Sequence, residues 1–340
     1  SFLHFAPCAC RGSSLNVAVI GAGVSGLAAA RTLTDLGLKP KVFESDDEVG
    51  GRIRTVHLGG FLFDAGATTI APRGRDLEEV MFRRVSGEGL VKIERPVFVH
   101  NSLRVSAGDP AKNRIDRYCY VGGNQTLCDR LAANLDVRNG AKIESIERAN
   151  HGFALNGESF DGLVLALPIP EAKKLLDSAG ESRPFSNSRY RSCLSVLLGY
   201  GFPDPDIGYH ALVDPDGTHP LGWLSFESLK CAGRAPEGKC AVVAQLGPQF
   251  SKLYFEATDE YIVEATLGML SRLYHRGWLE PEVSAVVRWE TSQPEMTAQF
   301  DSVNRPGSRL VVAGDGLIGP RVEYAYECGV KAARLLAEAK

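Results

Sequence analysis

Three glycines near the start of the chain have the spacing of a phosphate-binding turn. The run Gly21-Ala22-Gly23-Val24-Ser25-Gly26 follows a short apolar segment, Asn16 to Ile20, and precedes apolar residues at helical spacing. Glycines at these places permit a tight turn, close approach of the backbone to a pyrophosphate, and close packing of a helix on a strand. The start of such a helix directs unpaired N–H groups toward phosphate oxygens. The sequence therefore predicts a dinucleotide site formed by Gly21, Ala22, Gly23, Ser25 and Gly26.

An acidic residue completes this unit. Gly37 and Pro40 end the first helix, and a second strand, Lys41 to Glu44, ends in a carboxylate eighteen residues after Gly26. A carboxylate at this position accepts hydrogen bonds from a ribose 2′-hydroxyl, which favours an unphosphorylated adenosine ribose. The glycine pattern alone is weak, but the surrounding strand, helix and acid make the interpretation specific.

The C-terminal region repeats the same order of elements. Arg309 to Ala313 has the pattern of a buried strand, Gly314-Asp315-Gly316 follows it, and an amphipathic helix begins near Arg321. A third such piece, Phe160 to Leu167, precedes a short helix over Glu171 to Leu176. Because these pieces lie at both ends and in the middle of the chain, we expect two domains that interleave.

The other segments predict a different architecture. Val91 to Arg104, Ser195 to Tyr200 and Cys240 to Leu246 read as strands bounded by turns, and Tyr261 to Tyr274 reads as an amphipathic helix. The expected fold class is α/β, a doubly wound Rossmann-like domain interleaved with an α+β substrate domain that has an antiparallel sheet.

Composition excludes several classes of function. The chain has 340 residues, 44% of them hydrophobic, and 38 basic against 41 acidic residues, a net charge of −3. This balance gives no basic excess for nucleic acid. The longest apolar stretch, Val17 to Ala30, is too short and glycine-rich for a transmembrane segment. Neither the seven histidines nor the eight cysteines have metal-ligand spacing, so no metal is expected.

These motifs resemble the flavin-containing amine oxidase superfamily. After Glu44 come Gly50-Gly51-Arg52 and then Asp64-Ala65-Gly66-Ala67, while Gly314-Asp315-Gly316 is similar to the last FAD element of the superfamily. The resemblance implies non-covalent FAD, with Asp315 holding the ribityl hydroxyls. It also implies cofactor contacts from Gly51, Arg52, Gly66 and Ala67.

Within the superfamily, the chain is more similar to the renalase family, from Asn16 to Leu336. The segments that carry this resemblance are Phe160 to Glu171, Ser188-Arg189-Tyr190, Arg288-Trp289, Gly314-Asp315-Gly316 and Arg321-Val322-Glu323. It implies that the backbone of Ile143 contacts the adenine and that the N–H of Val322 contacts the flavin. Renalases usually have Gln-Tyr after Asp-x-Gly-Ala, whereas Thr68-Thr69 stand here.

No side chain is assigned as catalytic, because a bound flavin itself accepts hydride at N5 and the protein supplies position and electrostatics. Three residues are candidates for the substrate pocket: Trp289, Arg321 and Tyr190. Amine oxidases proper have an aromatic residue at the position of Arg321, and a guanidinium repels a cationic amine and attracts an anion. Each candidate has an alternative: Trp289 and Tyr190 as core packing, and Arg321 as a surface or structural ion pair.

The expected function is that of an FAD-dependent oxidoreductase. The renalase resemblance implies a small planar substrate, a dihydropyridine such as an isomer of NAD(P)H, with molecular oxygen as the electron acceptor. No second glycine-rich unit and no redox cysteine pair supports a disulfide reductase. Two alternatives stay open: an amine oxidase or desaturase-like flavoenzyme, and a flavoprotein with a regulatory or interaction role.

We assign residues 15–72, 118–175 and 285–340 to the FAD-binding domain, and residues 73–117 and 176–284 to the substrate domain. Residues 1–14 contain no acid and are interpreted as a leader outside the fold. They are compatible with the remnant of an organelle transit peptide, or with a disordered leader or an expression remnant. The scattered cysteines indicate a reducing compartment, the cytoplasm or an organelle (chloroplast or mitochondrion).

Overall fold

The computed structural model describes residues 15–101, 104–185 and 187–339. Its first layer is a five-stranded parallel sheet. The strands lie in the order β19 (Leu310–Val312), β13 (Gly162–Leu165), β1 (Val17–Ile20), β2 (Lys41–Phe43) and β9 (Asp136–Arg138). β1, β13 and β19 are buried along their whole length, as the apolar runs predicted. Segments from both ends of the chain therefore meet in one sheet.

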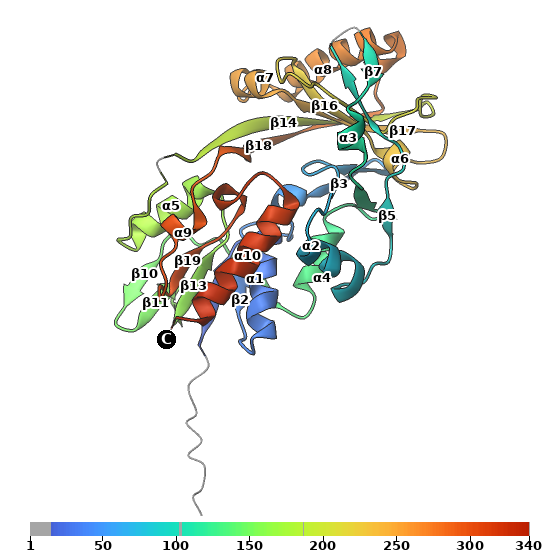
Figure 1. Cartoon of the computed structure of the whole chain (residues 1–340). Coiled ribbons are helices and arrows are strands. Elements are labelled where there is room, and N and C mark those ends of the chain that lie inside the picture. Colours follow the sequence, from blue (N-terminus) through green and yellow to red (C-terminus); the bar gives the residue numbers. More distant parts are fainter. Residues whose placement is uncertain (1–14, 102–103, 186, 340) are drawn as a thin grey trace, which may run out of the picture.

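Two helices cover one face of this sheet and pack closely on each other. α1 (Val24–Asp35) and α10 (Val322–Ala337) lie side by side, as Figure 1 shows for the blue and red helices. The contact needs Gly329, because a Cβ there would lie 2.0 Å from the carbonyl oxygen of Ser25. α4 (Thr126–Ala132) packs against the other side of α1. The start of α10 is thereby fixed relative to the glycine-rich turn before α1.

A small antiparallel unit and several short elements surround the parallel sheet. β10 (Glu147–Ala149), β11 (Gly152–Leu155) and β12 (Glu158–Phe160) form a three-stranded sheet that precedes β13. Two hairpins pair β3 (Thr55–Leu58) with β4 (Phe61–Asp64), and β5 (Leu90–Lys92) with β8 (Tyr118–Tyr120). The short helices are α2 (Arg75–Glu79), α3 (Pro110–Asn113), α5 (Ile169–Ser178), α6 (Glu227–Lys230) and α9 (Phe300–Val303).

The second main layer is a seven-stranded, mostly antiparallel sheet. Its order is β18 (Val283–Met296), β14 (Arg189–Tyr200), β17 (Cys240–Leu246), β16 (Leu221–Phe226), β15 (Ala211–Val213), β6 (Val97–His100) and β7 (Val105–Ala107). α8 (Asp259–Leu273) and the shorter α7 (Pro248–Leu253) cover its outer face. The paired β14 and β18 are long, and in Figure 1 they run from the region of α5 and α9 to this upper sheet.

The predicted fold class is confirmed, since a doubly wound parallel sheet and a largely antiparallel sheet alternate along the chain. The assigned domain boundaries stay predictions. β18 crosses the boundary placed at residue 285, and its Val283 to Met296 pair with β14 of the seven-stranded sheet. The leader assigned to residues 1–14 lies outside the described residues.

Among the described helices, none combines the length and the apolar character that crossing a membrane requires.

The α1–α10 contact provides a test of the packing. Gly329→Val places a branched side chain where even a Cβ would meet Ser25 and Ala28. We expect this overpacking to lower the free energy of unfolding by about 1–3 kcal/mol, measured by urea denaturation. Gly268→Ala, in α8, is the matched control because nothing lies within 4 Å of its Cβ position. That variant should gain about 0.5–1 kcal/mol from helix propensity. Equal stability of both variants would contradict the packing.

Candidate functional site

The glycine-rich turn leaves the parallel sheet between β1 and α1. Gly21 has φ +99°, and a Cβ there would lie 2.5 Å from the carbonyl oxygen of Ala166. A Cβ at Gly26 would lie 1.8 Å from the carbonyl oxygen of Gly21, so both positions need glycine for packing. Gly23 differs, because a Cβ there meets nothing within 4 Å. Gly23 therefore lies where another molecule can approach the backbone closely.

Ser25 adds an unused hydrogen-bonding group to this turn. Its Oγ is buried and has no hydrogen-bond partner in the part of the chain that the structure describes. Buried polar groups are nearly always paired, so an unpaired hydroxyl in the first turn of a helix indicates a missing acceptor. A phosphate oxygen at the start of α1 supplies such an acceptor.

Glu44 follows β2 and connects three neighbouring groups. Its Oε2 accepts a hydrogen bond from the N–H of Ala22 at 2.7 Å, and its Oε1 accepts from the N–H of Asp46 at 3.0 Å and from Ser45 Oγ at 3.1 Å. Glu44 is only 8% exposed. A carboxylate has about four acceptor sites, so Glu44 can hold the turn and still accept from a ribose hydroxyl.

Arg52 joins the two ends of the chain. Its guanidinium forms a bidentate pair with Asp315, with both N···O distances 2.8 Å, although 263 residues separate the two. The same guanidinium donates to the carbonyl oxygens of Thr291 and Ser292 in β18. Burial alone would lower the pKa of Arg52, but Asp315 outweighs it, and the pKa is raised. Arg52 thus stays charged and fixes the element around Asp315.

Three of the predicted cofactor residues adjoin Arg52. Gly51 precedes it in the sequence, and Gly66 and Ala67 lie against its carbonyl oxygen. The N–H of Ala67 donates to the carbonyl oxygen of Arg52 at 3.0 Å, and a Cβ at Gly66 would lie 2.0 Å from that same oxygen. A Cβ at Gly51 would lie 3.5 Å from the Cα of Gly23. These residues therefore connect the glycine-rich turn with the segment that follows β4.

Ile143 and Val322 lie at separate places along the edge of the parallel sheet. Ile143 follows β9, and the nearby N–H of Ala141 donates to the carbonyl oxygen of Glu44 at 2.7 Å. Val322 is the first residue of α10. Among the described residues, no hydrogen bond uses the backbone of Ile143 or the N–H of Val322. Both backbones are therefore free to contact a cofactor that extends along this edge.

The pocket candidates Trp289 and Tyr190 contact the cofactor segments. Trp289 is half-buried in β18, and its Nε1 donates to the carbonyl oxygen of Ala65 at 3.1 Å and to Ser195 Oγ at 3.2 Å. Tyr190 Oη accepts from the N–H of Ile169 at 3.4 Å, and burial raises the pKa of this phenol. The same Oη occupies the space where a Cβ of Gly316 would lie.

Arg321 stands just before α10, and no carboxylate pairs with it within residues 15–101, 104–185 and 187–339. Its guanidinium lies 5.0 Å from the centre of the Tyr324 ring and donates to Tyr324 Oη at 3.3 Å. Arg321 is partly exposed. Among the described residues, no acidic side chain forms the surface or structural ion pair that is the alternative interpretation of Arg321.

FAD fits the residues present. Gly23 leaves room for close approach, Ser25 Oγ is a buried group without a partner among the described residues, and both lie at the start of α1, where the first-turn N–H groups have no helical partner. Glu44 would hold the ribose, Asp315 the ribityl chain, and Val322 the ring. A bound flavin would supply hydride acceptance, and the protein would bind and orient it.

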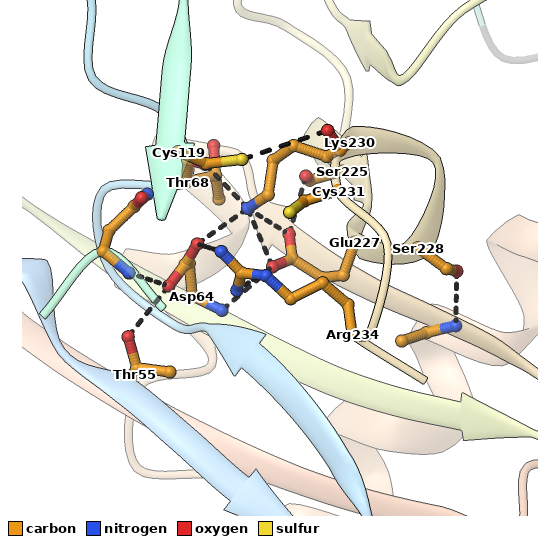
Figure 2. Close-up of polar contacts among 12 residues, drawn as sticks. Thr55, Asp64, Thr68, Cys119, Ser225, Glu227, Ser228, Lys230, Cys231 and Arg234 are labelled. Atoms are coloured by element: carbon orange, nitrogen blue, oxygen red, sulfur yellow. Dashed lines mark hydrogen bonds and ion pairs between the residues drawn. The ribbon is translucent and has the colours of Figure 1, made fainter. Parts of the chain in front are cut away.

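Sequence reasoning missed a buried cluster of charges behind Gly66 and Ala67. Lys230 and Arg234 pair with Asp64 and Glu227, and all four side chains are fully buried. Figure 2 shows the four side chains converging, with Thr55 and Thr68 beside them. The available signal was the spacing of Glu227, Lys230 and Arg234 between two apolar strands. Such a spacing also fits a solvated turn, so it singled out no site.

The family of the chain follows from comparison with known proteins. The sequence model of the family described as flavin containing amine oxidoreductase matches residues 24–92 and 98–337. The chain belongs to this family. The predicted oxidoreductase class and FAD cofactor are thereby confirmed, and the renalase subtype stays a prediction.

Two curated relatives of this flavin amine oxidoreductase match it over short segments. Protoporphyrinogen oxidase 2 of Arabidopsis thaliana is 53% identical over 58 residues, 17% of this chain and 11% of that protein. The 4,4'-diapophytoene desaturase of Staphylococcus aureus is 45% identical over 56 residues, 16% of this chain and 11% of that protein. The chain thus matches about a tenth of the length of these relatives.

Solved structures with the same fold cover almost the whole chain. A putative protoporphyrinogen oxidase from Exiguobacterium has a TM-score of 0.75 at 15% identity and covers 95% of this chain and 98% of its own. Cyclohexylamine oxidase from Brevibacterium oxydans has a TM-score of 0.74 at 15% identity, over 96% and 99%. At these identities the comparison shows the fold of the flavin amine oxidoreductases.

Glu44 offers a test of the predicted cofactor contacts. Glu44→Ala removes the acceptor of the Ala22 N–H together with the predicted ribose contact. Because a hydrogen bond to a charged group contributes about 1.5–3 kcal/mol, we expect FAD affinity to fall by about 10- to 100-fold. Titration of apoprotein with FAD, followed by quenching of flavin fluorescence, measures the change. Glu158→Ala, whose carboxylate pairs with Lys41 at the surface, is the control. Unchanged affinity in the Glu44 variant would contradict the assignment.

Proposed function

We propose that this protein is an FAD-dependent oxidase of a small, planar, anionic substrate, a dihydropyridine such as an isomer of NAD(P)H. Molecular oxygen is the proposed electron acceptor. The observation that supports the substrate charge is the unpaired guanidinium of Arg321 beside the first turn of α10. That turn also contains the N–H of Val322, which we assign to the flavin.

Arg321 favours an anion over an amine for an electrostatic reason. Its nearest recorded partner is the neutral Tyr324 phenol, so the cation is not compensated by a carboxylate in the described chain. A second cation, such as a protonated amine, is repelled, whereas a phosphate or carboxylate forms a charge-assisted hydrogen bond. Arg321 is partly exposed, so a ligand can reach this side chain.

The side chains on the face of the seven-stranded sheet that lies toward Gly66 favour a planar substrate. Trp289, Ser195 and Gln245 lie on three adjacent strands, and Ser195 pairs in register with Gln245. Gln245 Nε2 donates to the carbonyl oxygen of Gly66, and Trp289 Nε1 donates to that of Ala65. The hydrogen bonds of Nε1 to Ala65 and Ser195 fix the Trp289 side chain. Its partly exposed ring can therefore serve as a rigid wall for a flat ligand.

The substrate assignment is tested by anaerobic reduction of the bound flavin. Purified holoprotein is mixed without oxygen with dihydronicotinamide isomers, with primary amines, and with a polyene. We expect the flavin absorbance near 450 nm to bleach only with a dihydropyridine, and admission of oxygen to restore it with release of hydrogen peroxide. Bleaching by an amine or by the polyene alone would replace the proposal with the corresponding alternative. An inert flavin would favour a non-catalytic role.

Arg321 is tested separately by its effect on substrate affinity. Arg321→Met removes the charge but keeps an unbranched side chain, so we expect KM for a phosphate-bearing dihydropyridine to rise about tenfold. A dihydropyridine without phosphate should be affected little. Arg305→Met, at an exposed position, is the control. If KM rises equally for both substrates, Arg321 does not recognise the anion.

A further inference from the structure

The segment of residues 65–68, directly after β4, has an unusual set of hydrogen bonds. Each of its four consecutive carbonyl oxygens accepts a hydrogen bond from a side-chain nitrogen. The donors are Trp289 Nε1 to Ala65 at 3.1 Å, Gln245 Nε2 to Gly66 at 2.6 Å, Asn124 Nδ2 to Ala67 at 2.9 Å, and Lys230 Nζ to Thr68 at 2.8 Å. They come from β18, β17, the loop before α4, and α6. Side chains distant in sequence thus fix the orientation of every peptide in this segment.

The remaining backbone groups of the segment are donors. The N–H groups of Ala65 and Ala67 donate to the carbonyl oxygens of Arg54 and Arg52. The N–H groups of Gly66 and Thr68 form no hydrogen bond with any residue that the structure describes. Since all four carbonyls already accept from side chains, the unpaired backbone groups that the segment can offer a ligand are these two N–H donors. Gly66 is partly exposed, and a ligand can reach it.

Lys230 is the charged member of this set of anchors. Its Nζ donates to Thr68 O, to Asp64 Oδ2 at 2.8 Å and to both Glu227 oxygens at 2.8 and 2.9 Å. Asp64 ends β4, and its N–H donates to Glu227 Oε2 at 3.1 Å. Burial pushes the pKa of Asp64 up, but Lys230 and Arg234 outweigh it, and the pKa is lowered. The cluster of Asp64, Glu227, Lys230 and Arg234 contains two acidic and two basic side chains, so its formal charges balance.

Such a cluster is a poor source of stability. Desolvation of buried ions roughly cancels their attraction, and well-packed apolar residues of similar size often serve as well or better. What apolar residues cannot do is hold a carbonyl oxygen in one orientation. Lys230 does this for Thr68, the residue at which the chain departs from the Gln-Tyr of the renalase pattern.

We propose that Lys230 is a positioning residue that, with the other three anchors, turns the carbonyls of residues 65–68 away from the flavin and leaves the N–H groups of Gly66 and Thr68 to face it. The inference rests on the proposed function only in placing Gly66 and Ala67 at the cofactor. Backbone N–H groups directed at an electron-rich ring stabilise the negative charge of its reduced form, whereas a carbonyl turned toward it opposes that charge. The anchors would thereby raise the reduction potential of the flavin.

The experiment compares variants as FAD-loaded holoproteins. Lys230→Met removes the anchor of Thr68 but leaves an unbalanced buried charge. Lys230→Met with Glu227→Gln keeps the balance between Asp64 and Arg234. Gln245→Leu removes a neutral anchor, that of Gly66, without touching the cluster. Lys239→Met is the control, because Lys239 directly precedes β17, the strand that contains Gln245, and pairs with Glu282 at the surface.

The readouts are the visible circular dichroism of the bound flavin, its reduction potential against a reference dye, and the separate values of kcat and KM. In the balanced double variant and in Gln245→Leu, we expect a more negative reduction potential and a changed flavin dichroism. We also expect kcat to fall about tenfold or more in both variants, with KM nearly unchanged. Lys239→Met should match the wild type. Variants that bind FAD with wild-type dichroism and potential would overturn the inference, whatever their thermal stability.

The result is separable from the proposed function. The potential and the dichroism are measured with chemical reduction and need no substrate, so a wrong substrate assignment does not affect them. Wild-type protein that oxidises none of the tested compounds would count against the proposed function alone. If the flavin keeps its wild-type potential and dichroism when either anchor is removed, the result counts against the inference alone.

Discussion

The bidentate pair between Arg52 and Asp315 is the contact on which the predicted cofactor site depends. It joins residues 263 positions apart and binds the guanidinium to β18 as well. One charged interaction thus connects the first Rossmann unit, the last glycine-bearing turn and the seven-stranded sheet. The parallel sheet makes this geometry possible, because β1 and β19 both pair with β13 and their carboxyl ends lie at one edge.

Close backbone contacts fix the relative positions of the elements that form this arrangement. Gly26 and Gly329 allow α1 to lie against both the glycine-rich turn and α10, at distances that no larger residue permits. Gly66 similarly lies against the carbonyl of Arg52. Behind this surface, the buried cluster around Lys230 ties the segment after β4 to α6 of the other sheet. The cofactor side and the substrate side are therefore linked by polar contacts as well as by apolar packing.

The sequence predicted the elements whose signals are local. The βαβ unit from Val17 to Phe43, the strand before Gly314 and the helix after Arg321 follow from periodicity and glycine punctuation, and all are present. Contacts between distant residues were not predictable in this way. No spacing rule pairs Gln245 with Gly66 or Lys230 with Thr68, because each bond depends on how two sheets pack. For the same reason, the sequence could not decide whether Arg321 forms an ion pair.

The position of β19 and α10 has a consequence for biosynthesis. One edge strand of the parallel sheet, β19, and the element around Asp315 need residues 310–337, which are synthesised after nearly every other part of this sequence. Until then β13 pairs with β1 but lacks its second neighbour, β19, and α1 exposes the face that α10 will cover. A nascent chain that ends before residue 310 therefore lacks the part of the predicted cofactor site that contains Asp315 and Val322.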